Sequence, residues 1–206
     1  MTVKRFCNGG LDENCYVVSD GGKAFVIDPG EENQAVYHAL EGLVVEYILL
    51  THGHYDHIGG VAWLAEKTGA KIVAHEDERI ILEQEGMNLS PLFGAYMHLS
   101  PDRVVTDGEL LEVGRMQVRV LHTPGHTAGS VCYLCDGVLV SGDTLFAQSI
   151  GRTDFPTGSM TQMHKSLYRL TQLDGRLRVL SGHGDETTIA EEIIKNPYMR
   201  EQDDAF

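Results

Sequence analysis

Three histidines and one aspartate lie within six residues of each other in segment 51–60, which reads THGHYDHIGG. The apolar run 46–50 before it is typical of a short buried strand, and residues 61–67 after it have the apolar spacing of a helix. The cluster is therefore expected on a strand-to-helix loop. Packing does not explain it, because each imidazole needs a polar partner and a short loop offers few. A shared metal ion satisfies all of these groups together.

Alternation along the loop divides the four side chains into two groups. His52 and His54 can point the same way and share one ion. Asp56 and His57 belong to the turn that enters the helix, so they can reach a second ion. The next residues, 59–60, are a pair of glycines, which supply the compact backbone that such a turn needs. An exposed polar loop with chance histidines would need a coincidence at four positions, so metal binding is the favoured interpretation.

Length and charge limit the classes of protein to consider. A chain of 206 residues can bury roughly 70% of its unfolded surface, and we expect one domain over residues 1–206. The net charge is −14 and the 16 Lys and Arg residues form no run, so we expect no nucleic acid partner. We expect no membrane span either, because no apolar stretch approaches eighteen residues. The sequence leaves the oligomeric state open.

The four cysteines, and the lack of an apolar N-terminal segment like a signal peptide, predict a cytoplasmic protein in a reducing environment. Cys132 and Cys135 have the spacing of a redox or zinc pair. They lie in an apolar run, however, and we favour the interpretation that both are small core side chains.

The rest of the chain alternates between strand and helix patterns. Strands are expected at residues 14–18, 23–27, 71–74, 109–113, 116–121, 131–135, 138–141 and 178–180. Helices are expected at residues 31–41, 76–85, 160–170 and 188–195. Residues 86–101 show no clear period but include Phe93 and Tyr96 among several apolar side chains. We expect this segment to form a mobile lid on the site, with packing under the domain as the alternative.

Three more polar residues, His126, Asp143 and His183, each follow an apolar run that predicts a strand. Because a sheet gathers its strand ends along one edge, we expect them to meet the 51–60 cluster there. Asp28 also ends an expected strand, and a carboxylate that supports the metal loop explains it as well as an ordinary Asp-Pro-Gly turn. The other five histidines are expected to be structural: His38, His75, His98, His122 and His164.

In order and spacing, these motifs resemble those of the metallo-β-lactamase superfamily over nearly the whole chain. The matching runs are His52-x-His54-x-Asp56-His57, Gly-His126-Thr-x-Gly-Ser, Ser-Gly-Asp143-Thr-Leu-Phe and Ser-Gly-His183-Gly. The chain is most similar to the glyoxalase II (hydroxyacylglutathione hydrolase) branch, particularly its short bacterial members, and next to persulfide dioxygenases. The resemblance implies an α/β (α+β) fold, a four-layer αβ/βα sandwich of two mixed β-sheets flanked by helices.

The resemblance also implies a ligand set. One metal ion would be held by His52, His54 and His126, and a second by Asp56, His57 and His183, with Asp143 bridging the two. Imidazole and carboxylate ligands suit two divalent ions, zinc first, with iron or manganese as alternatives.

The implied activity is hydrolysis of a small-molecule thioester, an S-acyl thiol conjugate, by a hydroxide shared between the metals. Asp56 and Asp143 would be the carboxylates of the reaction centre. The alternative activity is that of a mononuclear-iron, persulfide dioxygenase-like enzyme, with His52, His126 and Asp143 as its iron ligands.

Two departures from glyoxalase II concern the substrate. The chain ends about two dozen residues after His183, where glyoxalase II continues into a helical domain that helps to bind glutathione. Arg152 and Asp154 stand where glyoxalase II has a Lys and a Tyr near glutathione. Arg152 either clamps a substrate carboxylate or pairs with Asp154. With Phe93 and Tyr96, these are the expected substrate contacts, and we expect glutathione to be bound weakly.

Overall fold

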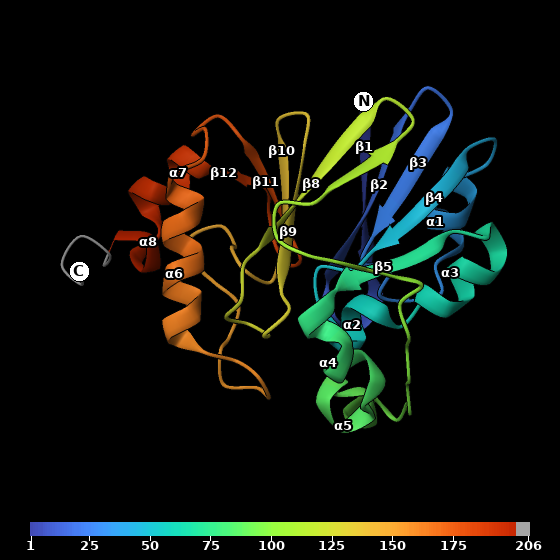
Figure 1. The fold of residues 1–206 in the computed structure, drawn as a ribbon, viewed down its shortest axis with the longest axis horizontal. Coiled ribbons are helices and arrows are strands. Elements are labelled where there is room, and N and C mark those ends of the chain that lie inside the picture. The colour runs from blue at the N-terminus through green and yellow to red at the C-terminus, as the bar shows by residue number, and fades with distance from the viewer. Residues whose placement is uncertain (201–206) are drawn as a thin grey trace.

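The computed structural model describes residues 1–200 and contains two six-stranded sheets (Figure 1). The strand order is β1-β2-β3-β4-β5-β6 in the first sheet and β12-β11-β10-β9-β8-β7 in the second. The first sheet consists of β1 (Thr2–Asn8), β2 (Glu13–Asp20), β3 (Lys23–Ile27), β4 (Val44–Leu49), β5 (Lys71–His75) and β6 (Arg103–Val105). The second consists of β7 (Leu110–Val113), β8 (Met116–His122), β9 (Val131–Cys135), β10 (Val138–Gly142), β11 (Arg178–Ser181) and β12 (Thr187–Thr188).

The helices lie mostly between strands. They are α1 (Gln34–Ala39), α2 (Tyr55–Ile58), α3 (Val61–Thr68), α4 (Arg79–Glu83), α5 (Glu85–Asn88), α6 (Met160–Thr171), α7 (Ile189–Lys195) and α8 (Pro197–Arg200). Three short 3₁₀ helices are η1 (Gly9–Leu11), η2 (Glu76–Glu78) and η3 (Ser90–Phe93). No helix within residues 1–200 is long and apolar enough to cross a membrane.

Both sheets are mixed, as expected. Strands β1 to β3 pair antiparallel, whereas β3 to β6 run parallel. In the second sheet β7 to β10 are antiparallel and β10 pairs parallel with β11. The β9–β10 hairpin turns at Asp136 and Gly137, which both have positive φ, as tight hairpin turns require. The parallel pairs β3–β4 and β4–β5 are joined through α1 and through α2 with α3, because a parallel connection needs a crossover.

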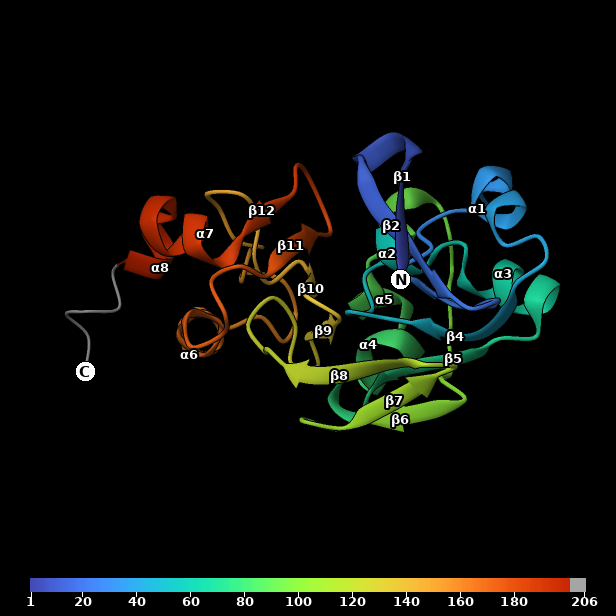
Figure 2. The ribbon, with the colours of Figure 1, turned by 90° about the horizontal axis from the view of Figure 1, so that it is seen from above.

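Helices cover the outer faces of both sheets, so the molecule has four layers in the order helix, sheet, sheet, helix (Figure 2). Side chains such as Phe25 and Tyr133 fill the space between the sheets. Leu64 of α3 packs in the cluster behind the first sheet, and Leu167 of α6 in the cluster behind the second. The expected four-layer αβ/βα sandwich is confirmed.

Some elements differ from the sequence prediction. The strand β1 was not expected, because its exposed Lys4 and Arg5 break the apolar pattern; such charges suit an edge strand. The strand β6 was also missed. The helix expected at residues 31–41 is shorter, since Asn33 caps it by accepting from the backbone N–H groups of the first turn. Segment 76–85 divides into η2 and α4, and segment 86–101 contains α5 and η3 rather than irregular chain throughout.

The ends of β3, β4, β10 and β11 meet at one end of the sandwich, where backbone hydrogen bonds join the two sheets. The Asn14 N–H donates to the Gly182 carbonyl at 2.8 Å, and the Val131 N–H donates to the Thr51 carbonyl at 2.9 Å. These bonds bring the loops after the strand ends together.

Candidate metal centre

The first group of expected ligands, His52, His54 and His126, is brought together by two loops. One ligand atom from each lies within 4.8 Å of the others. The ring centroids are 4.7–4.9 Å apart and each pair of rings is nearly perpendicular. Nδ1 of His54 lies 2.9 Å from Nε2 of His126. This convergence of three imidazoles is the arrangement expected of a metal ligand set.

The second group, Asp56, His57 and His183, meets beside the first. Its ligand atoms also lie within 4.8 Å of each other. Oδ2 of Asp56 is 3.3 Å from Nε2 of His183 and 3.8 Å from Nε2 of His57. His57 is fully buried, whereas His183 and Asp56 are partly exposed, so solvent and substrate reach this group more easily than the first.

Asp143, at the end of β10, lies between the two groups. Its Oδ1 is 3.4 Å from Nε2 of His57. Its Oδ2 is 3.6 Å from Nε2 of His126 and 3.7 Å from Nε2 of His183. One carboxylate thus faces a ligand of the first group and two of the second.

Several buried polar atoms here have no hydrogen-bond partner within residues 1–200. They include Nε2 of His52, His54 and His57 and Oδ1 of Asp143. A buried polar atom without a partner costs about 1–3 kcal/mol, so four of them in one place would be costly in a merely structural cluster. Divalent cations in the cluster supply partners for Nε2 of His52, Nε2 of His57 and Oδ1 of Asp143, whereas His54 presents Nδ1 to the cluster. The residues therefore fit a pair of bound metal ions.

Hydrogen bonds from outside the centre orient the imidazoles. Nδ1 of His57 lies 3.0 Å from Oδ2 of Asp28, and Nδ1 of His126 lies 2.7 Å from the Arg152 carbonyl. Such bonds fix which ring nitrogen faces a metal. Asp28 also accepts from the Thr51 N–H at 2.8 Å and has a φ of 48°, which is unusual for a residue with a side chain. Of the two interpretations of Asp28, its contacts favour support of the metal loop.

The charges of the centre also suit metal binding. Burial lowers the pKa of His54 to about 3 and the pKa of His52 well below its ordinary value, so both imidazoles are neutral bases at pH 7. Burial opposes ionisation of Asp143, but the neighbouring His57 lowers the pKa of this carboxyl below its usual range. Neutral imidazoles and an ionised carboxylate are the forms that bind metal ions. Burial opposes protonation of His57, but Asp143 and Asp56 raise the pKa of this imidazole, so it must release its proton when a metal ion binds.

Glu78 of η2 is a buried carboxylate that the sequence analysis missed. Its Oε1 accepts from the Gly53 N–H at 2.7 Å, between two ligands of the first group. Its Oε2 accepts from the Thr127 hydroxyl at 2.8 Å and from the Gly129 N–H at 2.9 Å, next to His126. Glu78 therefore ties together the two loops that carry the first group. A Cβ on Gly129 would lie 2.3 Å from the Glu78 nitrogen, so this approach requires glycine.

A cavity of about 350 Å³ opens over the centre, and we call it the central cavity. It is lined by Leu11, His54, Asp56, Leu89, Leu92, Phe93, His126, Asp143, Phe146, Gly151, Arg152, Phe155 and His183. Of the expected substrate contacts, Phe93 and Arg152 line it. Tyr96 is 77% exposed and Asp154 is 67% exposed at its side chain, and neither lines the cavity. Leu11, Phe146 and Phe155 were not expected.

Arg152 is engaged by its neighbours. Its Nε and Nη2 donate to the two carboxylate oxygens of Asp154 at 2.6 and 2.7 Å. Its guanidinium lies 3.8 Å from the ring centroid of Phe155. Of the two interpretations of Arg152, the structure contains the ion pair with Asp154.

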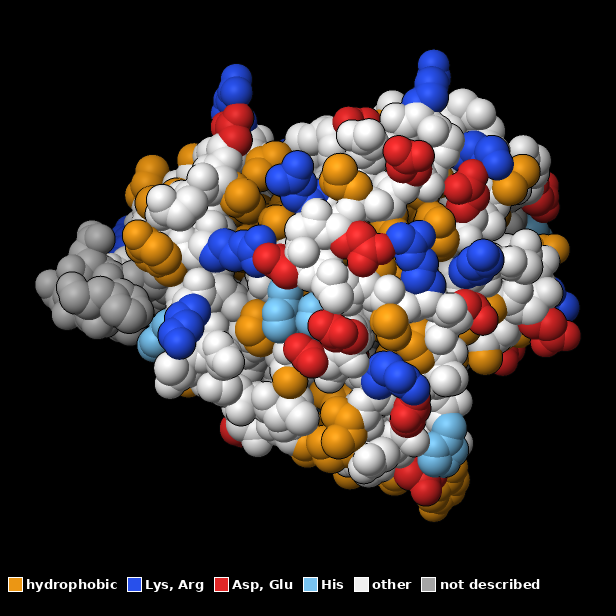
Figure 3. Space-filling view, viewed as in Figure 1, with side chains coloured by type: hydrophobic (Ala, Val, Ile, Leu, Met, Phe, Trp, Pro, Cys, Tyr) orange, Lys and Arg blue, Asp and Glu red, His pale blue; other side chains and the backbone are white. Residues whose placement is uncertain are grey.

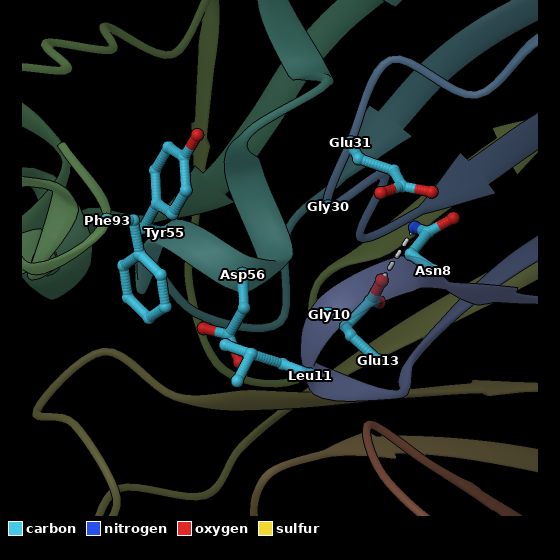
Figure 4. Close-up of a pocket in the computed structure, with 9 residues that line it drawn as sticks. All are labelled: Asn8, Gly10, Leu11, Glu13, Gly30, Glu31, Tyr55, Asp56 and Phe93. Carbon is cyan, nitrogen blue, oxygen red and sulfur yellow. Dashed lines mark hydrogen bonds between the residues drawn. The ribbon is translucent and has the colours of Figure 1, made fainter. Parts of the chain in front are cut away.

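A second hollow of about 180 Å³, which we call the side hollow, adjoins the centre at Asp56 (Figure 4). Tyr55 and Phe93 stand on one side of it, and Glu13 and Asn8 stand on the other. Leu11, Asp56 and Phe93 line both the side hollow and the central cavity.

The remaining cysteine and histidine predictions concern residues away from the centre. Cys132 and Cys135 are buried and form no disulfide, which supports their role as core side chains. His75 and His122 stack with their ring centroids 3.9 Å apart, near Asp77. Nδ1 of His75 accepts from the Asp77 N–H, and Nε2 of His122 bonds the Ala128 carbonyl, so structural partners already engage these nitrogens.

The sequence profile of the Metallo-beta-lactamase superfamily matches residues 8–183. The chain belongs to this superfamily. It is 33% identical to the hydroxyacylglutathione hydrolase GloC of Haemophilus influenzae, over 92% of this chain and 93% of that protein. The crystal structure of the B3 metallo-beta-lactamase BLEG-1 is similar, with a TM-score of 0.90, 38% identity, and coverage of 96% of this chain and 99% of that one. The di-iron-bound form of TTHA1623 has a TM-score of 0.85 and 34% identity, covering 95% and 99% of the two chains.

With its similarity to named hydrolases of the superfamily, the protein is a metal-dependent hydrolase. Its His and Asp cluster accommodates two divalent metal ions, as in similar structures of the superfamily.

Proposed function

We propose that this protein is a thioester hydrolase of the glyoxalase II type. In this proposal His52, His54 and His126 hold one metal ion, and Asp56, His57 and His183 hold the other. Asp143 bridges them. The proposal is supported by the position of the Asp143 carboxylate between the two groups, 3.4 Å from His57 and 3.6 Å from His126. We propose zinc as the metal, with iron or manganese as alternatives that the same ligands accept.

Two divalent ions in such a site lower the pKa of bound water from ~15.7 towards ~7 and polarise a carbonyl group. The protein's own residues hold and orient this centre. The neutral imidazoles supply nitrogen ligands, and Asp28 and the Arg152 carbonyl keep the rings in position.

The observation that carries the thioester assignment is the lack of a dedicated general acid. Within residues 1–200, apart from the expected ligands, the lining of the central cavity contains one charged side chain, Arg152, which does not release a proton near neutral pH. An amide nitrogen must be protonated to leave easily, whereas a thiol with a pKa near 8.5 leaves as a thiolate. The site therefore suits thioesters better than amides.

We propose an S-acyl conjugate of a small thiol as the substrate, because a similar protein is a hydroxyacylglutathione hydrolase. Arg152 already pairs with Asp154, so its positive charge is largely neutralised and attracts a glutathione carboxylate only weakly. We expect lactoylglutathione to be hydrolysed slowly, with a KM above the ~1 μM–1 mM range of most native substrates. The four free cysteines fit a reducing cytoplasm, which we propose as the compartment.

Steady-state kinetics test this function on the metal-loaded protein. The panel contains lactoylglutathione, an acyl-coenzyme A, a thioester of a simple thiol and a β-lactam. We expect comparable kcat/KM values for the thioesters and a lower value for the β-lactam. Hydrolysis of the β-lactam with no thioester turnover would contradict the thioester assignment. A low-micromolar KM for lactoylglutathione alone would contradict the expected weak binding of glutathione.

The alternative function is a mononuclear-iron persulfide dioxygenase with His52, His126 and Asp143 as ligands. The second group favours the hydrolase, because Asp56, His57 and His183 converge although the dioxygenase leaves them without a metal. Oxygen uptake with a persulfide substrate discriminates between the two, and we expect none above the uncatalysed rate.

A further inference from the structure

The central cavity is mostly apolar apart from the expected metal ligands. Its apolar side chains come from four separate parts of the chain: Leu11, Leu89, Leu92, Phe93, Phe146 and Phe155. Binding sites for small molecules are commonly lined by such side chains, with a few polar groups that fix the reacting atoms. Here the polar groups are those of the metal centre.

These apolar side chains surround the centre on several sides. The ring of Phe155 stands edge-on to His54 with a centroid separation of 5.6 Å. The ring of Phe146 stands edge-on to His183 at 6.0 Å. Leu11 and Phe93 line the cavity beside Asp56. An apolar group attached to a carbonyl at the centre therefore meets apolar side chains on both sides of it.

The wall formed by residues 89–93 is held in place by its neighbours. The Ser90 N–H donates to Oδ1 of Asn88 at 3.0 Å, and the Met97 N–H donates to the Ser90 hydroxyl at 3.0 Å. Asn88 and Ser90 are fully buried. The ring of Phe93 stacks on Tyr55 with centroids 5.2 Å apart and an angle of 23° between the planes.

This wall exposes large apolar side chains beside the centre. Leu92 is 74% exposed and Phe93 is 46% exposed. Figure 3 shows hydrophobic side chains at the surface over the region of α4 and α5, next to this wall. Exposed apolar patches of this kind mark binding surfaces when they border a functional site.

Within residues 1–200, apart from the expected metal ligands, the cavity lining has few hydrogen-bonding side chains for a polar or charged acyl group. Arg152 already donates two hydrogen bonds to Asp154 and lies over Phe155. A hydroxyl or carboxylate on the acyl group would lose hydrogen bonds to water without a ready replacement. A larger, polar thiol carrier has more freedom at the exposed mouth of the cavity.

We infer that the preferred substrates carry an apolar acyl group, a medium-length aliphatic chain or an aromatic ring, which packs against Leu92 and Phe93. This inference rests on the proposed thioesterase function and narrows its substrate class.

The test uses thioesters of N-acetylcysteamine with lactoyl, acetyl, butyryl, hexanoyl and octanoyl groups and the metal-loaded protein. We expect kcat/KM to rise roughly two- to fourfold for each added methylene group until the cavity is filled, because each buried methylene favours binding by about that factor. The lactoyl thioester should have a lower kcat/KM than the butyryl thioester. A flat series, or a preference for lactoyl, overturns the inference and leaves the thioesterase function in place.

Variants test whether Leu92 and Phe93 cause the dependence on acyl chain length. Leu92→Ser and Phe93→Ala should reduce the rise in kcat/KM to less than about twofold per methylene. The matched controls, Ile194→Ser and Tyr168→Ala, change exposed side chains on α7 and α6 and should leave it unchanged. If Leu92→Ser and Phe93→Ala retain the full dependence with intact folding, the assignment of this wall is wrong.

Two further measurements separate the possible failures. The first uses acetyl thioesters of alkanethiols from ethanethiol to octanethiol, in which the apolar chain is on the thiol. If kcat/KM rises more steeply with chain length in this series than in the acyl series, the apolar cavity does not bind the acyl group and the inference is overturned. If no thioester is hydrolysed, the proposed function fails. The second measurement then tests the cavity alone, by calorimetric comparison of the affinities for hexanoate and acetate. The inference predicts that the protein binds hexanoate at least about tenfold more tightly than acetate. Equal affinity overturns it.

Discussion

Oδ1 of Asp143 lies 3.4 Å from Nε2 of His57, although the two residues follow strands of different sheets. Asp143 follows β10 of the second sheet, and His57 lies in α2, after β4 of the first. The close approach of Gly182 to both permits this contact, since a Cβ there would lie 2.3 Å from Oδ1 of Asp143 and 2.7 Å from Cε1 of His57. The proposed metal centre is therefore also a contact between the two halves of the sandwich.

Replacing Asp143 should affect both proposed metal sites. We expect Asp143→Ala to abolish activity and to leave fewer than about one ion per chain, because a bridging carboxylate serves two ions and a ligand loss weakens each. His57→Ala should mainly empty the second site. Elemental analysis of the purified variants measures this, and a full metal complement in Asp143→Ala would refute the bridging role.

Glu78 should hold the two loops of the first group together. Glu78→Ala leaves the donors of Gly53, Thr127 and Gly129 without their acceptor, so we expect a loss of about 2–5 kcal/mol in the free energy of unfolding. Denaturant unfolding measures this loss. Glu76→Ala changes an exposed acid in the same turn and should cost less than about 0.5 kcal/mol. Equal stabilities of the two variants would contradict the role of Glu78.

Burial raises the pKa of Glu78 to about 7, and this predicts a pH dependence. Between the ordinary pKa of 4.5 and about 7, the folded protein holds a proton that the unfolded chain has released, so its stability falls as pH rises through this window. Glu78→Gln removes the titrating group. We compare the free energies of unfolding of the metal-free variant and the metal-free wild type. We expect the difference between them to change in favour of the variant by roughly 2–4 kcal/mol from pH 4.5 to pH 8. A difference that stays constant with pH would show that Glu78 does not titrate there.

Asp154 should weaken the binding of anionic substrates by Arg152, because the two side chains already form an ion pair. Both side chains are exposed, so solvent screens their attraction and the pair is weak. Asp154→Ala is therefore expected to lower the KM for lactoylglutathione by up to about fivefold, with no change for an uncharged thioester of N-acetylcysteamine. An equal change for both substrates would show that the guanidinium does not meet the glutathione carboxylates.

The positions of the seven expected ligands could be predicted because each polar residue follows an apolar run. Strand ends meet at a sheet edge, so His126 and Asp143 could be placed with the 51–60 cluster without knowledge of distances. The resemblance divided six of these residues into two groups, and the structure brings the side chains of each group together.

Other features could not be predicted, because they depend on tertiary packing. Glu78 has the sequence context of an ordinary acid at a helix start, and the two approaching loops bury it. Leu11 lies in the short helix η1, whereas Phe146 and Phe155 lie outside helices and strands, so no periodic pattern marks any of them in the sequence. The ion pair between Arg152 and Asp154 was one of two alternatives, and the positions of the two side chains, which the sequence does not give, distinguish them.

Metal titration of the metal-free protein tests the central claim most directly. A chelator removes bound metal, zinc is added back in steps, and thioester hydrolysis is measured at each step with total bound metal. The proposed function predicts that activity reaches its maximum near two ions per chain. Full activity at one ion per chain, or persulfide oxidation restored by one iron ion with no thioester hydrolysis, would contradict it.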